Sequence, residues 1–123
     1  WQSNKNLRLF RYGEILLIKA EVENELNDTT ASKSALNQLR VRAGLLPVNA
    51  ISQSDMRNTI YKERRWEMAF EHDRMFDLRR TGRAASVLQA QGKAYQAPKN
   101  DLYPIPQNQR NKSENRISQN FGY

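Results

Sequence analysis

Residues 9–27 favour a helix that is apolar on two of its sides, and this feature constrains the fold more than any other. The stretch contains no proline and is rich in good helix formers. At about 100° per residue, a first apolar stripe consists of Leu9, Tyr12, Leu16 and Ala20. A second, displaced stripe consists of Ile15, Ile18, Val22 and Leu26. A helix with two apolar sides normally packs between two neighbours, so the sequence predicts partner helices on both sides.

A second helix is expected over about residues 31–43, after a turn at Asn27–Thr30. Its inward residues are Ala35, Leu36 and Leu39, and Gly44 is well placed to end it. The chain therefore contains a helix–turn–helix over about 9–43, and the 34 residues from Phe10 to Ala43 match the period of a tetratricopeptide repeat. Such units cannot bury their apolar faces alone. Only one copy is present, so further helices are expected to pack on it.

A third, long helix is expected over about residues 55–80, with Ser54 as its N-cap and Thr81–Gly82 at its end. Its apolar stripe consists of Met56, Ile60, Phe70 and Leu78.

Charged residues fall on this same stripe. Glu63, Glu67 and Glu71 follow at intervals of four residues and repel one another. Turning them toward a core is unfavourable unless cations and hydrogen bonds meet them. Arginines of the same helix are close, and Arg40 or Arg42 can reach them from the second helix. The prediction is a structural ion-pair network formed by Glu63, Arg64, Glu67, Glu71, Arg74 and Asp77.

Other interpretations of this stripe are an acid–base pair, a metal site and a contact with an unknown ligand or partner. Glu67 and Glu71 are the pair that would perform acid–base work. A di-iron site of carboxylates needs a Glu-x-x-His pair, but the residue three before His72 is Ala69. His72 is expected to be an exposed surface residue. The sequence thus predicts no catalytic residue, no metal site and no cofactor, and it leaves the ligand-binding residues unidentified.

Composition excludes several functions. The chain has no cysteine and one histidine, which excludes disulfides, thiol catalysis and metal sites that need two imidazoles. Its net charge of +7 lies mainly in residues 79–123, where 8 Lys and Arg face 2 Asp and Glu. These cations are spread singly, so a solvated tail or an acidic partner is favoured over nucleic acid. The apolar run Ile15–Ile18 is far too short to span a membrane.

Residues 83–123 are expected to form an extended, mostly irregular tail. Residues 84–91 favour a short helix that Gly92 ends. Leu102–Pro106 alternates apolar residues with prolines, which predicts an extended strip on a surface. The aromatic residues near the final glycine predict an end that packs back. The predicted fold class is all-α, a tetratricopeptide-like helical repeat segment with a mostly irregular C-terminal tail.

Six motifs, in order along the chain, resemble those of the SusD/RagB family. They are RYGEILLIKAE at Arg11–Glu21, LRVRAGL at Leu39–Leu45, IYKERRWEMAFE at Ile60–Glu71, RMFDLRRTG at Arg74–Gly82, YPIP at Tyr103–Pro106 and QNFGY at Gln119–Tyr123. Two departures are His72, where the family usually has Gly, and Phe121, where it usually has Pro. The match spans nearly the whole chain.

The resemblance implies that residues 1–123 are the C-terminal part of a SusD/RagB-like domain. Such proteins are lipid-anchored on the outward face of the outer membrane. They bind glycans or other nutrients, without catalysis, for a TonB-dependent SusC-like transporter. The N-terminal region that carries the lipid anchor would be absent from this chain, which begins at Trp1. None of the matched motifs is a sugar-binding motif of the family, so no ligand residue is carried over.

An alternative is a helical interaction module of the tetratricopeptide type. Its basic tail would dock on an acidic partner or on nucleic acid. Because the tail has no groove-reading helix and no closely spaced stacking aromatics, we expect no specific binding to DNA or RNA.

Overall fold

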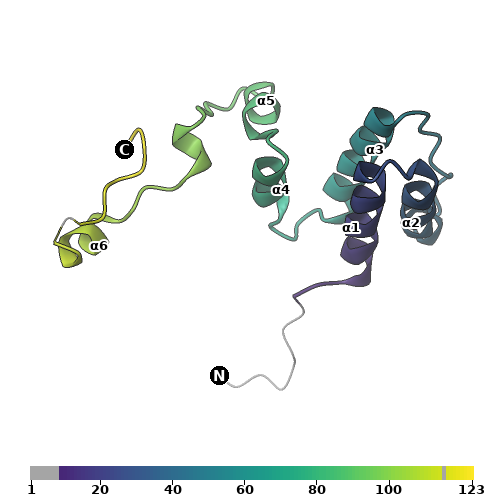
Figure 1. Ribbon diagram of the computed structural model, residues 1–123, viewed down its shortest axis with the longest axis horizontal. Coiled ribbons are helices and arrows are strands. Elements are labelled where there is room, and N and C mark those ends of the chain that lie inside the picture. Colours follow the sequence, from purple (N-terminus) through teal and green to yellow (C-terminus); the bar gives the residue numbers. More distant parts are fainter. Residues whose placement is uncertain (1–8, 115) are drawn as a thin grey trace, which may run out of the picture. The chain divides into compact units, whose positions relative to one another are not determined.

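The computed structural model describes residues 9–114 and 116–123, and in this part of the chain helices are the regular secondary structure (Figure 1). The predicted all-α class is confirmed. The chain divides into two compact units, the first ending at His72 and the second beginning at Asp73. Among the described residues, no helix has both the length and the apolar character needed to cross a membrane.

The first unit begins with a helical hairpin of α1 (Tyr12–Glu25) and α2 (Thr29–Arg42). Asn27 takes a left-handed conformation with φ of 66° after α1, a role that asparagine tolerates better than most residues. The Asp28 carboxylate then accepts a hydrogen bond of 2.8 Å from the Ala31 amide and caps α2. The predicted helix–turn–helix is thus present, with the two helices packed against each other.

Gly44 ends α2 as predicted. Its φ is 68°, its amide donates to the Val41 carbonyl, and the Leu45 amide donates to the Arg40 carbonyl. This pair of bonds is a Schellman motif, which satisfies carbonyls that the end of the helix leaves open.

The third helix, α3 (Gln53–Glu67), begins with a capping box at Ser52. The Ser52 hydroxyl accepts a hydrogen bond from the Asp55 amide, and the Asp55 carboxylate accepts one from the Ser52 amide. The prediction of Ser54 as N-cap is wrong, because a capping box needs a spacing of three residues between the two partners.

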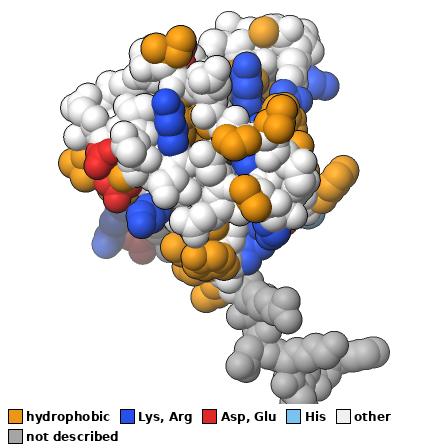
Figure 2. Space-filling model, turned by 90° about the vertical axis from the view of Figure 1, so that its right-hand side faces the viewer, with side chains coloured by type: hydrophobic (Ala, Val, Ile, Leu, Met, Phe, Trp, Pro, Cys, Tyr) orange, Lys and Arg blue, Asp and Glu red, His pale blue; other side chains and the backbone are white. Residues whose placement is uncertain are grey.

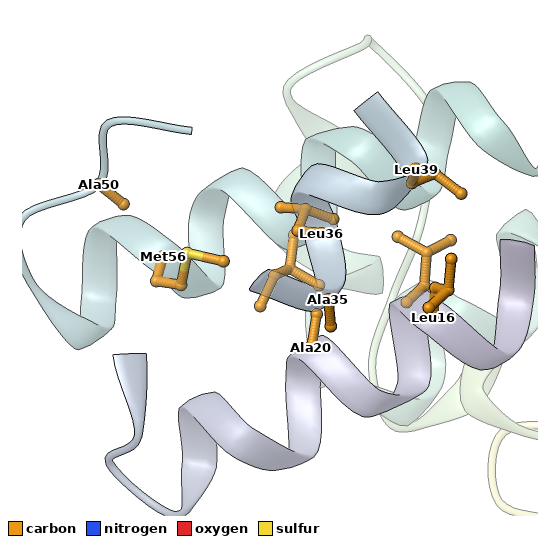
Figure 3. Packing of buried hydrophobic residues seen from close by; sticks show 9 residues of the cluster. Leu16, Ala20, Ala35, Leu36, Leu39, Ala50 and Met56 are labelled. Atoms are coloured by element: carbon orange, nitrogen blue, oxygen red, sulfur yellow. The ribbon is translucent and has the colours of Figure 1, made fainter. Parts of the chain in front are cut away.

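The core of the first unit lies between these three helices (Figure 3). In this view Ala35 and Leu36 of α2 lie above Ala20 of α1, Met56 of α3 lies to their left, and Leu39 lies above Leu16. The inward positions predicted for α2 are therefore confirmed. Small residues bring α1 and α2 close together, since the buried Ser32 hydroxyl donates a hydrogen bond of 2.6 Å to the Ala20 carbonyl.

The second apolar stripe of α1 is exposed. Its four residues expose between 39% and 71% of their surface; they are Ile15, Ile18, Val22 and Leu26. Leu9 and Tyr12 of the first stripe are also exposed. Within the described residues, α1 packs on both α2 and α3, but neither helix covers this second stripe. On the face shown in Figure 2, hydrophobic side chains lie in patches between lysine and arginine side chains.

The prediction of one long helix over residues 55–80 is wrong. α3 ends at Glu67 and a separate helix, α4, runs over Arg74–Arg80. Phe70 and His72 have φ of 67° and 61°, which a right-handed helix does not allow. Phe70, predicted on the inward stripe, is 99% exposed. At this break the Arg11 guanidinium, which comes from the segment before α1, bonds the Glu67 carbonyl, one of the last carbonyls of α3.

The second unit consists of α4, two further short helices and a 3₁₀ turn. These are α5 (Ala84–Gln89), η1 (Lys99–Asp101) and α6 (Gln107–Lys112). The short helix at α5 agrees with the sequence, whereas α6 was not expected in a tail predicted as extended over 83–123. Leu78, Ala84 and Tyr95 form the small core of this unit.

Side-chain amides hold the C-terminal residues in place within the second unit. The Gln119 side chain accepts from the Ile105 amide at 2.7 Å and donates to the Ile105 carbonyl at 3.0 Å. Asn120 donates to the Tyr103 carbonyl at 2.6 Å, and the Tyr123 hydroxyl donates to a neighbouring carbonyl at 3.3 Å. The final motif therefore packs back on the YPIP motif, as the sequence predicted for the end of the chain.

Candidate functional site

Glu67 is the centre of a charged cluster at the end of α3. Its side chain is 12% exposed and forms ion pairs with Arg11 and with Arg42. Arg42 Nη2 lies 2.6 Å and 2.7 Å from the two carboxylate oxygens. Burial alone would raise the pKa of Glu67, but the hydrogen bonds from Arg11 and Arg42 outweigh it and hold the pKa below its usual value.

Arg11 joins a second carboxylate to this cluster. Its guanidinium lies 2.8 Å from Glu71 and also bonds the Glu67 side chain and carbonyl. The hydrogen bond to Glu71 is the main reason that the pKa of Arg11 lies above its usual value, although burial acts in the opposite direction. One arginine thus links the residue before α1 to the residues at the end of α3.

Two further ion pairs connect α3 to the hairpin. Arg40 of α2 approaches Glu63 to 2.5 Å, and its Nε donates to the Leu46 carbonyl at 2.8 Å. Arg64 lies 3.3 Å from Glu14 of α1, with both side chains largely buried. The predicted residues Glu63, Arg64, Glu67 and Glu71 therefore all form ion pairs within the first unit. We call these residues and their partners, Arg11, Glu14, Arg40 and Arg42, the charged layer.

The two remaining predicted residues belong to the second unit. Asp77 of α4 has a side chain that is 2% exposed and is surrounded by three arginines. Arg74, Arg80 and Arg83 lie 3.4 Å, 3.0 Å and 3.2 Å from its oxygens. Arg74 and Asp77 lie on a separate helix from Glu63 and Glu67, because α3 ends at Glu67 and α4 begins at Arg74.

The sequence did not identify Arg11 or Glu14 as members of the charged layer. Both come from around α1, 50 or more positions before their partners. Gly13 also matters here, because a Cβ at this position would lie 2.6 Å from the Glu67 carboxylate. The absence of a side chain at Gly13 lets the Glu67 carboxylate approach the backbone of α1. The position of Gly13 in the sequence does not indicate this role.

The arginines of the charged layer keep the Glu67 carboxylate ionised, which does not suit acid–base catalysis. A general base works best with a pKa near the working pH, and the two arginines shift the pKa of Glu67 in the opposite direction. Among the described residues, no three His, Cys, Asp or Glu side chains lie in a group that could hold a metal ion.

Hollows lie on both sides of α2 in the first unit. One of about 570 Å³ is bounded by the loop after α2 and by α3, and its polar residues include Arg40, Asn58 and Lys62. Another of about 340 Å³ lies beside the charged layer and is lined by Tyr12, Gly13 and Arg42, among others.

A smaller hollow of about 210 Å³ lies in the second unit, where the tail passes over α4. Three tyrosines line it: Tyr95, Tyr103 and Tyr123. Burial, and then the hydrogen bond to Asp101, raises the pKa of Tyr95, so this hydroxyl stays protonated and donates to the Asp101 carboxylate at 2.7 Å.

These features define an all-helical, tetratricopeptide-like segment with internal ion pairs and surface hollows. The sequence model of the SusD family matches residues 1–123. SusD-like protein P2 of Formosa agariphila is 33% identical, with 99% of this chain and 27% of the relative aligned. SusD-like protein P38 of the same organism is 37% identical over 68% of this chain and 18% of the relative.

A solved structure has the same fold. A SusD-like protein from Bacteroides fragilis aligns with a TM-score of 0.75 and 28% identity, over 93% of this chain and 25% of that one. The chain belongs to the SusD family. It spans about a quarter of the length of SusD-like protein P2 and of the solved structure that it matches.

Proposed function

We propose that this chain is the C-terminal part of a cell-surface, nutrient-binding protein that binds glycans or other nutrients without catalysis. The whole protein would be lipid-anchored at the outer membrane and would deliver its ligand to a TonB-dependent SusC-like transporter. The match to the SusD family over residues 1–123 carries this proposal. The share of the relatives that the chain covers agrees with a role as one part of a longer domain.

The charged layer of the first unit is proposed to be structural. It joins the segment before α1, α2 and α3 through Arg11, Arg42 and Glu67, which come from three separate parts of the chain. The ion-paired state of Glu67 supports this role, because a carboxylate already held by two arginines is poorly placed to bind a substrate.

The partner is tested with the full-length protein. A tagged copy is expressed from the native locus, extracted in mild detergent and purified, and the co-purifying proteins are identified by mass spectrometry. We expect a large outer-membrane barrel of the TonB-dependent type in near-equal amount. An unrelated tagged lipoprotein purified in parallel is the control. Recovery of the protein without any barrel would contradict the proposed partnership.

The ligand and the location are tested separately. Binding of the purified full-length protein to a glycan array should identify one or a few related glycans. Protease treatment of intact cells should digest the protein, whereas a periplasmic marker stays protected. Turnover of the bound glycan would contradict the non-catalytic assignment.

The basic residues of the second unit motivate the alternative, a module that docks on nucleic acid. A gel shift at physiological salt distinguishes this module from the proposed nutrient-binding protein, because binding through many phosphates weakens steeply as the salt concentration increases. We expect no sequence-selective shift. A selective complex that survives this salt, together with no barrel partner, would favour the alternative.

A further inference from the structure

The tyrosine-lined hollow of the second unit has exposed aromatic surface at its rim. Tyr103 and Tyr123 expose 67% and 46% of their surface, and both line the hollow of about 210 Å³. Pockets for drug-sized ligands usually measure about 300 Å³ or more. This hollow therefore has room for a smaller group, such as one sugar ring.

Cations lie beside these rings. The Arg79 guanidinium carbon is 4.8 Å from the centre of the Tyr103 ring, and Lys99 Nζ is 5.2 Å from the centre of the Tyr123 ring. Lys93 also lines the hollow and is exposed. Among the described residues, no hydrogen bond or ion pair occupies the Lys93 ammonium.

Negative charge is scarce in the same place. The residues that line the hollow include Arg79 and Lys93 but no Asp or Glu. The neighbouring Asp101 is already used as an acceptor by Tyr95. Residues 73–123 hold nine Lys and Arg against four Asp and Glu, a net charge of +5. The electrostatics of this hollow therefore favour an anionic ligand over a neutral one.

The lining is also held in place before any ligand arrives. Asn120 fixes the backbone at Tyr103, and the Tyr123 hydroxyl donates to the Leu102 carbonyl. Arg79 donates to the Asn100 carbonyl at 2.6 Å. Because these side chains are already ordered, binding a ligand would cost little further conformational entropy, which favours binding.

We propose that this hollow is a subsite for a carboxylate-bearing sugar unit of an acidic oligosaccharide. The Lys93 ammonium would pair with the sugar carboxylate, and the open face of the Tyr103 ring would pack on the apolar face of the sugar ring. The side-chain amide nitrogen of Asn100 would donate to a hydroxyl group. This proposal rests on the proposed function as a glycan-binding protein.

The test uses the full-length protein and two oligosaccharides that differ only at the carboxyl groups, which are ionised in one and methyl-esterified in the other. Binding of an oligogalacturonate and of its methyl ester, equal in length, is measured by calorimetry at low ionic strength. The variant Lys93→Gln removes the proposed cation, and Lys112→Gln is the matched control, because Lys112 is exposed in the same unit and lies outside the hollow. Tyr103→Leu removes the ring.

We expect the free acid to bind more tightly than the ester. Lys93→Gln should weaken binding of the acid about two- to fivefold, the range of an exposed ion pair, and leave binding of the ester unchanged. Tyr103→Leu should weaken both ligands about two- to tenfold, as loss of an aromatic contact does. Lys112→Gln should change neither. Raising the ionic strength to about 0.5 M should weaken the acid selectively, because screening shortens the range of the attraction.

Several results would overturn the proposal. Equal affinity for acid and ester, or equal effects of Lys93→Gln and Lys112→Gln, would mean that the Lys93 ammonium does not bind the sugar carboxylate. Glycan binding by the wild type that no variant at this hollow changes would reject the subsite and leave the proposed function standing. Absence of glycan binding by the wild-type protein on any array would reject both. Circular dichroism of each variant verifies that its fold is intact.

Discussion

Replacing Glu67 with alanine removes two ion pairs at the end of α3. Breaking a fully buried pair costs about 3–5 kcal/mol, mainly because a charge is left without a partner. Here the remaining charges are better placed: Arg11 keeps its contact with Glu71 at 2.8 Å, and the side chain of Arg42 is already 60% exposed. We therefore expect a smaller loss for Glu67→Ala, about 2–3 kcal/mol in the free energy of unfolding.

Urea unfolding of the full-length protein measures this loss, and Glu25→Ala is the matched control. Glu25 also pairs with one arginine, at 2.6 Å, but its side chain is 49% exposed. Exposed pairs contribute little, so the control should change stability far less than Glu67→Ala. Ligand affinity of the folded Glu67→Ala protein should equal that of the wild type. Unchanged stability together with lost binding would refute the structural role of the charged layer and indicate a ligand site.

The same variant predicts a pH dependence. Because the pKa of Glu67 is lower in the folded than in the unfolded chain, its contribution is complete above the unfolded value, about 4.3. It is lost as the pH falls through the folded value. The stability difference between wild type and Glu67→Ala should therefore be largest at neutral pH and should narrow in acid. A difference that stays constant down to pH of about 2 would contradict the ionic explanation.

Three further predictions test the fold. Ser52→Ala should lower the unfolding free energy by about 1 kcal/mol through loss of the N-cap, whereas Ser54→Ala should change it by a few tenths; thermal unfolding followed by circular dichroism distinguishes the two. The isolated segment should self-associate through the exposed stripe of α1, and the double change Ile18→Ser and Val22→Ser should reduce this in analytical ultracentrifugation. A monodisperse wild-type monomer would show that the stripe needs no cover. Asp77→Ala leaves three arginines around an empty position and should lower stability by about 2–3 kcal/mol, measured as faster amide hydrogen exchange in α4; protection equal to the wild type would contradict this.

Much of the helical hairpin could be predicted from the sequence, because its determinants are local. The spacing of Ala35, Leu36 and Leu39 fixes the inward side of α2, and Gly44 supplies the left-handed residue that ends it. The end of α3 could not be predicted in this way. Phe70 and His72 take left-handed conformations without a glycine or proline nearby. The one signal was His72 in a position where the family usually has Gly.

The sequence could predict that the charged layer exists, but not which residues pair in it. Carboxylates on an inward stripe must meet cations, so the sequence predicted arginines around Glu63 and Glu67 and named Arg40 and Arg42 as candidates. Which arginine meets which carboxylate depends on tertiary packing. Arg11 reaches Glu67 across 56 positions of the chain, and no periodicity within one helix contains that information.

The amide contacts at the end of the chain place a chemical condition on the fold. Gln119 both gives and receives a hydrogen bond at Ile105, much as a residue of a paired strand would. The neutral amide does both, whereas a carboxylate has no hydrogen to donate. Deamidation of Gln119 would therefore set a negative oxygen against the Ile105 carbonyl, and the same change at Asn120 would do so at Tyr103. The order of this tail therefore depends on two side chains that are open to deamidation, a change of one amide group to a carboxylate in each.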